Sequence, residues 1–220
     1  MSRGVHMERV KVERHSATMR LLHWLIVIEG VILGLTGLQM GGVWGIKIFP
    51  EGLWSIHVVT GLAWIATSIF LIYYLVVTGE YRWYSVGRII YGLRFIYSEL
   101  GAWFSGAHVE EPIRYDKSRG EYVEKVVPSE VIAWWLMVFF GVILMTTGLG
   151  MAFKDNFSFF IDFYSMFKAV FGGDGYSISR ALHLLSTLFV LGIIIIHAYA
   201  VYVYRMIRGI VFGDREEPTL

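Results

Sequence analysis

The chain has 220 residues, of which 56% are hydrophobic and only 17% charged, with a mean hydropathy of +0.58 and a net charge of +1. A soluble domain carries roughly a quarter charged residues, so the composition argues against an ordinary soluble protein. The absence of cysteine excludes disulfides, cysteine-ligated iron–sulfur clusters and covalently attached c-type haem. Asn156 and Gln39 are the only side-chain amides, which suggests a thermophilic source, unless the apolar spans alone account for it.

Four apolar stretches are long enough to cross a bilayer, which takes about 20 residues. They run from Met19 to Gly41, Leu53 to Thr78, Glu130 to Phe153 and Ile178 to Tyr204. The first is too long for a signal peptide and no small-residue cleavage site follows it, so we interpret it as a retained helix. The predicted fold is an all-α membrane protein, a four-transmembrane-helix bundle that forms a single domain over residues 1–220.

Lysine and arginine are distributed unevenly around these spans. Fifteen lie in the N-terminal segment, the segment between spans two and three, and the C-terminal tail. The opposite side holds the remaining four, which are Lys47, Lys154, Lys168 and Arg180. By the positive-inside rule, both termini are predicted to be cytoplasmic in a prokaryotic cell membrane.

The cytoplasmic segment between spans two and three has two parts. Residues Trp83 to Phe104 are apolar and aromatic with interspersed arginines. This pattern predicts an interfacial helix lying on the membrane, with a loop packed under the bundle as the alternative. Residues Glu110 to Lys125 are strongly polar and predict a solvated loop.

The chain has seven histidines. His6, His15 and His108 lie in polar segments, where no role is expected. The other four lie inside the spans, where an ionisable side chain is costly and indicates function. They are His23, His57, His183 and His197.

The depths of these four histidines predict how they pair. His183 and His197 lie 14 residues apart on one helix, about 21 Å at 1.5 Å per residue, and share a face. They are too far apart to hold one small ligand. Only His57 with His183 near the outer surface, and His23 with His197 near the inner surface, match in height.

Two matched pairs at two depths are what two bis-histidine haems require, because neutral imidazole binds iron and bundles hold cofactors between facing helices. Small residues on the same helices favour close approach of a macrocycle, although they also favour close helix packing. They are Gly34, Thr36, Gly37, Gly61, Gly148, Gly150 and Gly192. The alternative is a haem-free anchor, or a proton or metal transporter, whose histidines form interhelical hydrogen bonds or a proton pathway.

Glu29 places a carboxyl group in the middle of the first span. It either delivers protons to a quinone or is a protonated carboxyl hydrogen-bonded to a neighbouring helix.

Three motifs carry a family resemblance. RLLHW (Arg20–Trp24), HVVTG (His57–Gly61) and a last span with histidines 14 residues apart followed by MIRGIVFGD (Met206–Asp214) resemble the cytochrome b subunit of membrane-bound formate dehydrogenase. The cytochrome b subunits of nickel–iron hydrogenases and thiosulfate reductases share this layout. The likeness covers nearly the whole chain.

The resemblance implies an electron-transfer subunit with two b haems, which is catalytic only within an oxidoreductase complex. His57 and His183 would ligate the outer haem, and His23 and His197 the inner haem. An iron–sulfur subunit and a catalytic subunit would dock on the outer face, and no nucleic-acid partner is expected. The outer loops Gly42–Gly52 and Lys154–Ser177 have few charges, and their aromatics fit a docking surface or a headgroup belt. These aromatics are Trp44, Phe157, Phe159, Phe160, Tyr164 and Phe167.

The resemblance also implies a quinone site near the inner haem, where the sequence departs from the family. The family has a Tyr-Asn-Ala-Gly-Gln-like motif before span three, whereas this chain reads KVVPSEVIAWW (Lys125–Trp135). Glu130 falls near the position of the glutamine, and Trp134 would line a flat apolar slot. Glu130 is otherwise a first-turn acid, favoured by the helix dipole and preceded by Ser129 as the helix cap.

Overall fold

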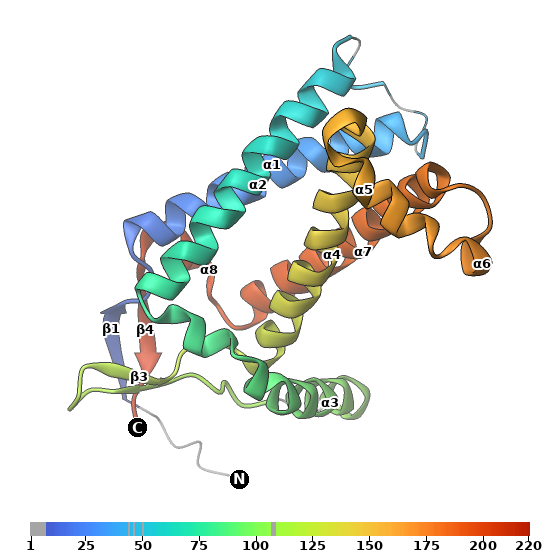
Figure 1. The fold of residues 1–220 in the computed structure, drawn as a ribbon. Coiled ribbons are helices and arrows are strands. Elements are labelled where there is room, and N and C mark those ends of the chain that lie inside the picture. The colour runs from blue at the N-terminus through green and yellow to red at the C-terminus, as the bar shows by residue number, and fades with distance from the viewer. Residues whose placement is uncertain (1–7, 44, 46, 50, 107–108) are drawn as a thin grey trace. The chain divides into compact units, whose positions relative to one another are not determined.

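The computed structural model describes residues 8–43, 45, 47–49, 51–106 and 109–220. Within these residues, four helices are long and apolar enough to cross a membrane (Figure 1). They are α1 (Ala17–Met40), α2 (Leu53–Val77), α4 (Pro128–Ala152) and α7 (Gly175–Val203). Each agrees with its predicted span to within three residues, so the four-helix membrane fold is confirmed.

Contacts divide the chain into two compact units. Unit 1 contains the described residues up to Arg20, together with Tyr74–Trp135 and Ile196–Leu220. Unit 2 contains Leu21–Tyr73 and Leu136–Ile195. The four long helices contribute to both units. Unit 2 therefore holds most of the apolar length of each span, and unit 1 holds the polar segments.

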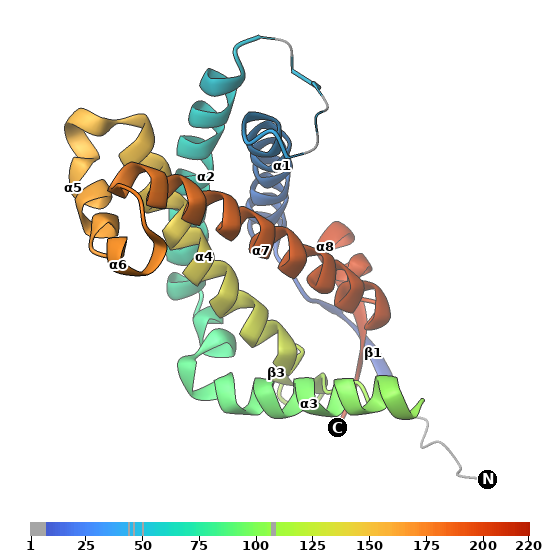
Figure 2. The same cartoon turned by 90° about the vertical axis from the view of Figure 1, so that its right-hand side faces the viewer.

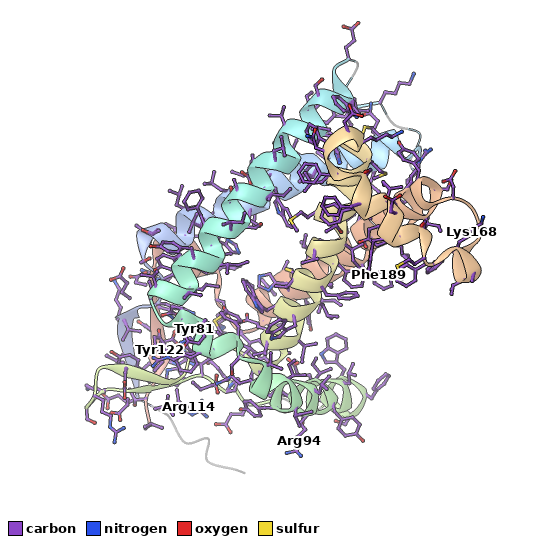
Figure 3. The ribbon with its side chains drawn as sticks, in the orientation of Figure 1. Tyr81, Arg94, Arg114, Tyr122, Lys168 and Phe189 are labelled. Atoms are coloured by element: carbon purple, nitrogen blue, oxygen red, sulfur yellow. The ribbon has the colours of Figure 1, made fainter. Side chains whose placement is uncertain are left out.

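In unit 2, close packing joins the second pair of long helices to each other and to a shorter helix. Phe140 of α4 stacks on Phe189 of α7, with ring centres 4.8 Å apart. Phe189 is labelled in Figure 3. Helix α5 (Lys154–Ser165) follows α4 directly, and a side chain at Gly175 would meet the Ile161 carbonyl oxygen of α5 at 2.5 Å. The start of α7 thus packs against the backbone of α5.

The segment after α4 is helical, in α5 and α6 (Lys168–Phe171), and its aromatics differ in exposure. Phe159 and Phe167 are exposed, but Tyr164 is buried. The Tyr164 hydroxyl forms a 2.8 Å hydrogen bond with the Thr146 hydroxyl of α4. The prediction of an exposed Tyr164 is therefore wrong, because this hydrogen bond anchors α5 to α4. Trp44 lies outside the described residues.

Unit 1 contains two small antiparallel sheets. Strand β1 (Arg9–Glu13) pairs with β4 (Asp214–Pro218), so segments near the two ends of the chain lie side by side (Figure 1). Strands β2 (Arg114–Asp116) and β3 (Glu121–Glu124) form a hairpin. The predicted solvated loop from Glu110 to Lys125 is therefore wrong. Its sequence is polar, but Ile113 and Lys125 are buried in it.

A network of buried charges holds these strands together. The Glu217 carboxylate of β4 is fully buried and accepts hydrogen bonds from Arg14 at 2.7 Å, Tyr122 at 3.1 Å, and Arg215. Burial alone lowers the pKa of the Arg14 guanidinium, but Glu217, Tyr122 and Glu130 together outweigh it, and the pKa lies above its ordinary value. The network requires three segments that are distant in sequence to fold together.

The segment between spans two and three contains the predicted helix. Two short 3-10 helices, η1 (Glu80–Tyr84) and η2 (Val86–Arg88), precede α3 (Ile89–Ser105), which ends at Gly106 in the left-handed conformation (Figure 2). The loop alternative is therefore wrong. A side chain at Gly92 would meet the Pro128 carbonyl oxygen at 2.6 Å, so α3 packs directly on the start of α4.

An apolar stripe on α3 is exposed at the surface of unit 1. Its members recur every three or four residues, which places them on one side of a helix. They are Ile90, Leu93, Tyr97, Leu100 and Phe104, all exposed. Arg94 is exposed beside this stripe (Figure 3).

Helix α4 begins two residues earlier than predicted. Pro128 is its first residue, a position that suits proline because the missing N–H has no partner in a helix anyway. Ser129 therefore lies inside the first turn, and its predicted role as the helix cap is wrong. Glu130 also lies in that turn.

Candidate haem site

The four predicted haem ligands lie on three of the long helices. His23 is on α1, His57 on α2, and His183 and His197 on α7. All four side chains are half-buried in the protein. His6 and His108 lie outside the described residues.

In unit 2 the structure brings His57 and His183 together. Their ring centres are 6.1 Å apart and the ring planes are inclined by 64°. Two imidazoles on opposite sides of one metal ion, each bound at about 2.0–2.1 Å, have centres about 6 Å apart. The spacing of this pair therefore fits a single iron between the two rings.

A threonine on a neighbouring helix contacts each of these rings at the same atom. The Thr36 hydroxyl of α1 lies 2.8 Å from His57 Nδ1, and the Thr147 hydroxyl of α4 lies 2.8 Å from His183 Nδ1. Both threonines are fully buried. The contacts restrain both rings and leave Nε2 as the nitrogen for a metal.

A glycine follows each threonine and makes room for the ring. A side chain at Gly37 would lie 3.2 Å from His57 Cε1, and one at Gly148 would lie 3.3 Å from His183 Cε1. These two glycines, which were expected to admit a macrocycle, thus accommodate the histidine rings. Gly34 and Gly61 instead lie near leucine side chains, at 3.7 Å and 3.8 Å.

The proposed inner ligands belong to different units, His23 to unit 2 and His197 to unit 1. Their pairing stays a prediction from depth. His23 contacts the neighbouring Trp24 edge to face, with ring centres 5.5 Å apart.

Glu29 of α1 forms an interhelical hydrogen bond. The Thr67 hydroxyl of α2 donates to Glu29 Oε1 at 3.0 Å. Glu29 Oε2 is buried and has no hydrogen-bond partner within the described residues. The hydrogen bond to a neighbouring helix, expected under one of the two interpretations of Glu29, is therefore present.

A cavity of about 250 Å³ lies in unit 1, next to the ends of α1 and α2. Its wall includes the buried Arg14, His15, the aromatic rings of Tyr74 and Tyr84, and Lys125. Lys125 forms an ion pair with Glu80 at 2.6 Å. Burial lowers the pKa of the Lys125 ammonium, although this ion pair acts in the opposite direction. His15, for which no role was expected, thus lines a polar and aromatic cavity.

The predicted quinone residues lie beside this cavity and do not line it. Trp134 stacks on Tyr84, with ring centres 4.9 Å apart, and the Trp135 indole donates to the Tyr84 carbonyl oxygen at 2.9 Å. Tyr84 therefore connects the start of α4 to the cavity wall. Burial, with the nearby Glu130 carboxylate, raises the pKa of the Tyr84 hydroxyl.

Sequence reasoning missed the contact made by Thr147 and took Thr36 only as a small residue. The sequence offered only a weak signal, because a Thr-Gly pair occurs at Thr36–Gly37 and Thr147–Gly148 but also at Thr60–Gly61 of the second span. Only the packing of α1 on α2 and of α4 on α7 shows which ring each pair contacts.

Comparison with protein families places the chain in a known family. Residues 14–211 match the family model of prokaryotic cytochrome b561, the b-type cytochrome subunit of nickel–iron hydrogenase-type complexes. A comparison with curated proteins found no match. The family match covers nearly the whole chain and all four intramembrane histidines. The chain therefore belongs to the prokaryotic cytochrome b561 family.

Proposed function

We propose that this protein is a di-haem subunit that carries electrons across the membrane between an iron–sulfur partner and quinone. Its family makes it a membrane b-haem electron-transfer subunit. The facing pair His57 and His183, with a 6.1 Å ring separation that suits one iron, is the observation that carries the proposal. This pair would hold the first haem.

The second haem would be held by His23 and His197. His197 lies 14 residues beyond His183 on α7, about 21 Å along the helix. Each haem, when bound, supplies a one-electron centre. Two centres at different depths would divide the bilayer into shorter electron-transfer steps than a single centre could.

The proposed orientation places both ends of the chain in the cytoplasm. The pairing of β1 with β4 supports a common side for both ends, and the excess of lysine and arginine supports the cytoplasm as that side. The iron–sulfur subunit and the catalytic subunit would then dock on the outer face, beside α5. The protein would reside in the cell membrane of a prokaryote.

Quinone would react at the cytoplasmic end, near the inner haem. Glu130 would relay a proton, and Trp134 would line the quinone slot. The stacking of Trp134 on Tyr84 supports this location, because Tyr84 also lines the cavity beside Arg14 and Lys125. The cavity therefore adds buried hydrogen-bond donors to the proposed site.

Counting haems in purified variants tests the proposal. The wild type should contain two low-spin b haems, and the double variant His23→Ala/His183→Ala should lose both. The matched double variant His57→Ala/His183→Ala should lose only one, because it removes both ligands of the same haem. Retention of one haem in His23→Ala/His183→Ala would disprove the pairing. A colourless wild type from haem-replete cells would instead support the haem-free anchor or transporter.

A further inference from the structure

Thr36 and Thr147 make the same set of contacts in two different helix pairs. The Thr36 hydroxyl lies 2.7 Å from the Ile32 carbonyl oxygen and 2.8 Å from His57 Nδ1. The Thr147 hydroxyl lies 2.5 Å from the Ile143 carbonyl oxygen and 2.8 Å from His183 Nδ1. A second carbonyl oxygen lies farther away in each case, that of Leu33 at 3.2 Å from the Thr36 hydroxyl and that of Leu144 at 3.3 Å from the Thr147 hydroxyl. Each hydroxyl therefore has one close carbonyl oxygen, one more distant carbonyl oxygen and one ring nitrogen as neighbours.

The number of available protons decides which group donates and which accepts in each threonine–histidine hydrogen bond. A hydroxyl has a single proton to donate, and two oxygens at 2.5–2.7 Å repel each other unless a proton lies between them. The threonine proton must therefore point to the helix carbonyl. The hydroxyl oxygen is then an acceptor, and the ring nitrogen must donate to it. Both histidines consequently carry their proton on Nδ1, which leaves the lone pair on Nε2.

We propose that Thr36 and Thr147 are positioning residues that fix the tautomer of His57 and His183 and lower the reduction potential of the outer haem. A ligand imidazole that donates its other N–H to an acceptor is more basic. A more basic ligand stabilises ferric iron over ferrous iron and so lowers the potential. This inference rests on the proposed outer ligands.

Redox titration of the intact two-haem protein tests this role. In Thr36→Val and in Thr147→Val, the midpoint potential of the outer haem should shift to more positive values. The double variant should shift further, and the inner haem should not change. Thr36→Ser and Thr147→Ser keep the hydroxyl and should restore the wild-type potential. Thr187→Val is the matched control, because the Thr187 hydroxyl donates to the His183 carbonyl oxygen and not to the ring.

The other possible results of the titration either support or overturn the role of the two threonines. Unchanged potentials in both valine variants, or equal shifts of both haems, would overturn the inference. Loss of the outer haem in a valine variant supports it if the serine variant retains that haem, and overturns it if the serine variant also loses it. Failure of the proposed function is distinguishable, because the wild type would then contain no haem to titrate. Failure of the proposed outer ligands alone would leave both haems bound in His57→Ala and His183→Ala.

Discussion

The carboxylate of Glu217 is shared by Arg14, Arg215 and Tyr122 in a fully buried position. Replacing it with alanine leaves two guanidinium groups buried without their shared counter-charge. Breaking a buried ion pair in this way costs about 3–5 kcal/mol. We therefore expect Glu217→Ala to lower the midpoint of thermal unfolding in detergent, followed by circular dichroism.

The adjacent Glu216 is exposed and provides the control. Glu216→Ala should change the free energy of unfolding by no more than about 0.5 kcal/mol, as surface substitutions usually do. Equal midpoints for the two variants would show that the buried network does not stabilise unit 1.

At the scale of single residues, sequence reasoning singled out the four histidines because ionisable side chains are rare inside a span. It did not find the network around Glu217. Arg14 and Glu217 are 203 residues apart, and each looks like an ordinary charged residue in a polar segment. Their burial depends on β1 pairing with β4, which no local pattern reveals.

Among the elements, the spans were predictable because a long apolar run has few alternatives to a membrane helix. The strands were not, because β2 and β3 have only three and four residues and are rich in charge. Helix α3 could be predicted only in part. Its apolar stripe indicated a helix, but its close contact with α4 depends on the absence of a side chain at Gly92.

The stripe on α3 makes the interfacial position testable. The chain has no native cysteine, so a spin label on a single introduced cysteine reports one position. Tyr97 lies within the stripe, and Ser98 is exposed on a different side of the helix. In liposomes, a label at Tyr97→Cys should be accessible to oxygen and shielded from a water-soluble relaxation agent. The control label at Ser98→Cys should show the reverse, and equal accessibility to the aqueous agent would place α3 away from the lipid.

Helix α5 and the residues after it form the proposed docking surface for the iron–sulfur subunit. Phe163 is 51% exposed and Met166 is 77% exposed, although both are apolar. Such exposed residues on a membrane subunit are typical of a protein interface. A photoreactive amino acid at Phe163 should cross-link the partner in the intact complex.

The β2–β3 hairpin provides the control for docking. Arg119 is exposed in the turn between its strands, on the side proposed to be cytoplasmic. A photoreactive group at Arg119 should not capture the iron–sulfur subunit. Cross-linking from Arg119 alone would contradict the proposed docking face and the proposed orientation.

At the scale of the whole molecule, the proposed electron transfer across the bilayer would have to end at a site that also reaches water. Quinone reduction takes two electrons and two protons, so the proposed inner haem alone would be insufficient. In unit 1, Glu130 lies in the first turn of α4, one turn before Trp134, which stacks on Tyr84, and Tyr84 lines the cavity. A carboxyl group there can relay protons, which predicts that Glu130 matters for quinone turnover although it binds no haem.

Glu130→Ala, prepared with both haems bound, tests this prediction. Reduced haems should transfer electrons to a quinone analogue more slowly than in the wild type, by about 10²-fold or more if Glu130 acts as the general acid. The exposed Glu121 of β3 provides a control, and Glu121→Ala should react at the wild-type rate. The competing explanation is that Glu130 only complements the dipole of α4, which stabilises a helix by about 0.3–1 kcal/mol. In that case the Glu130→Ala protein would be slightly less stable than the wild type but would transfer electrons to the quinone analogue at the same rate. Stopped-flow rates and unfolding midpoints measured on the same variant therefore separate the two roles.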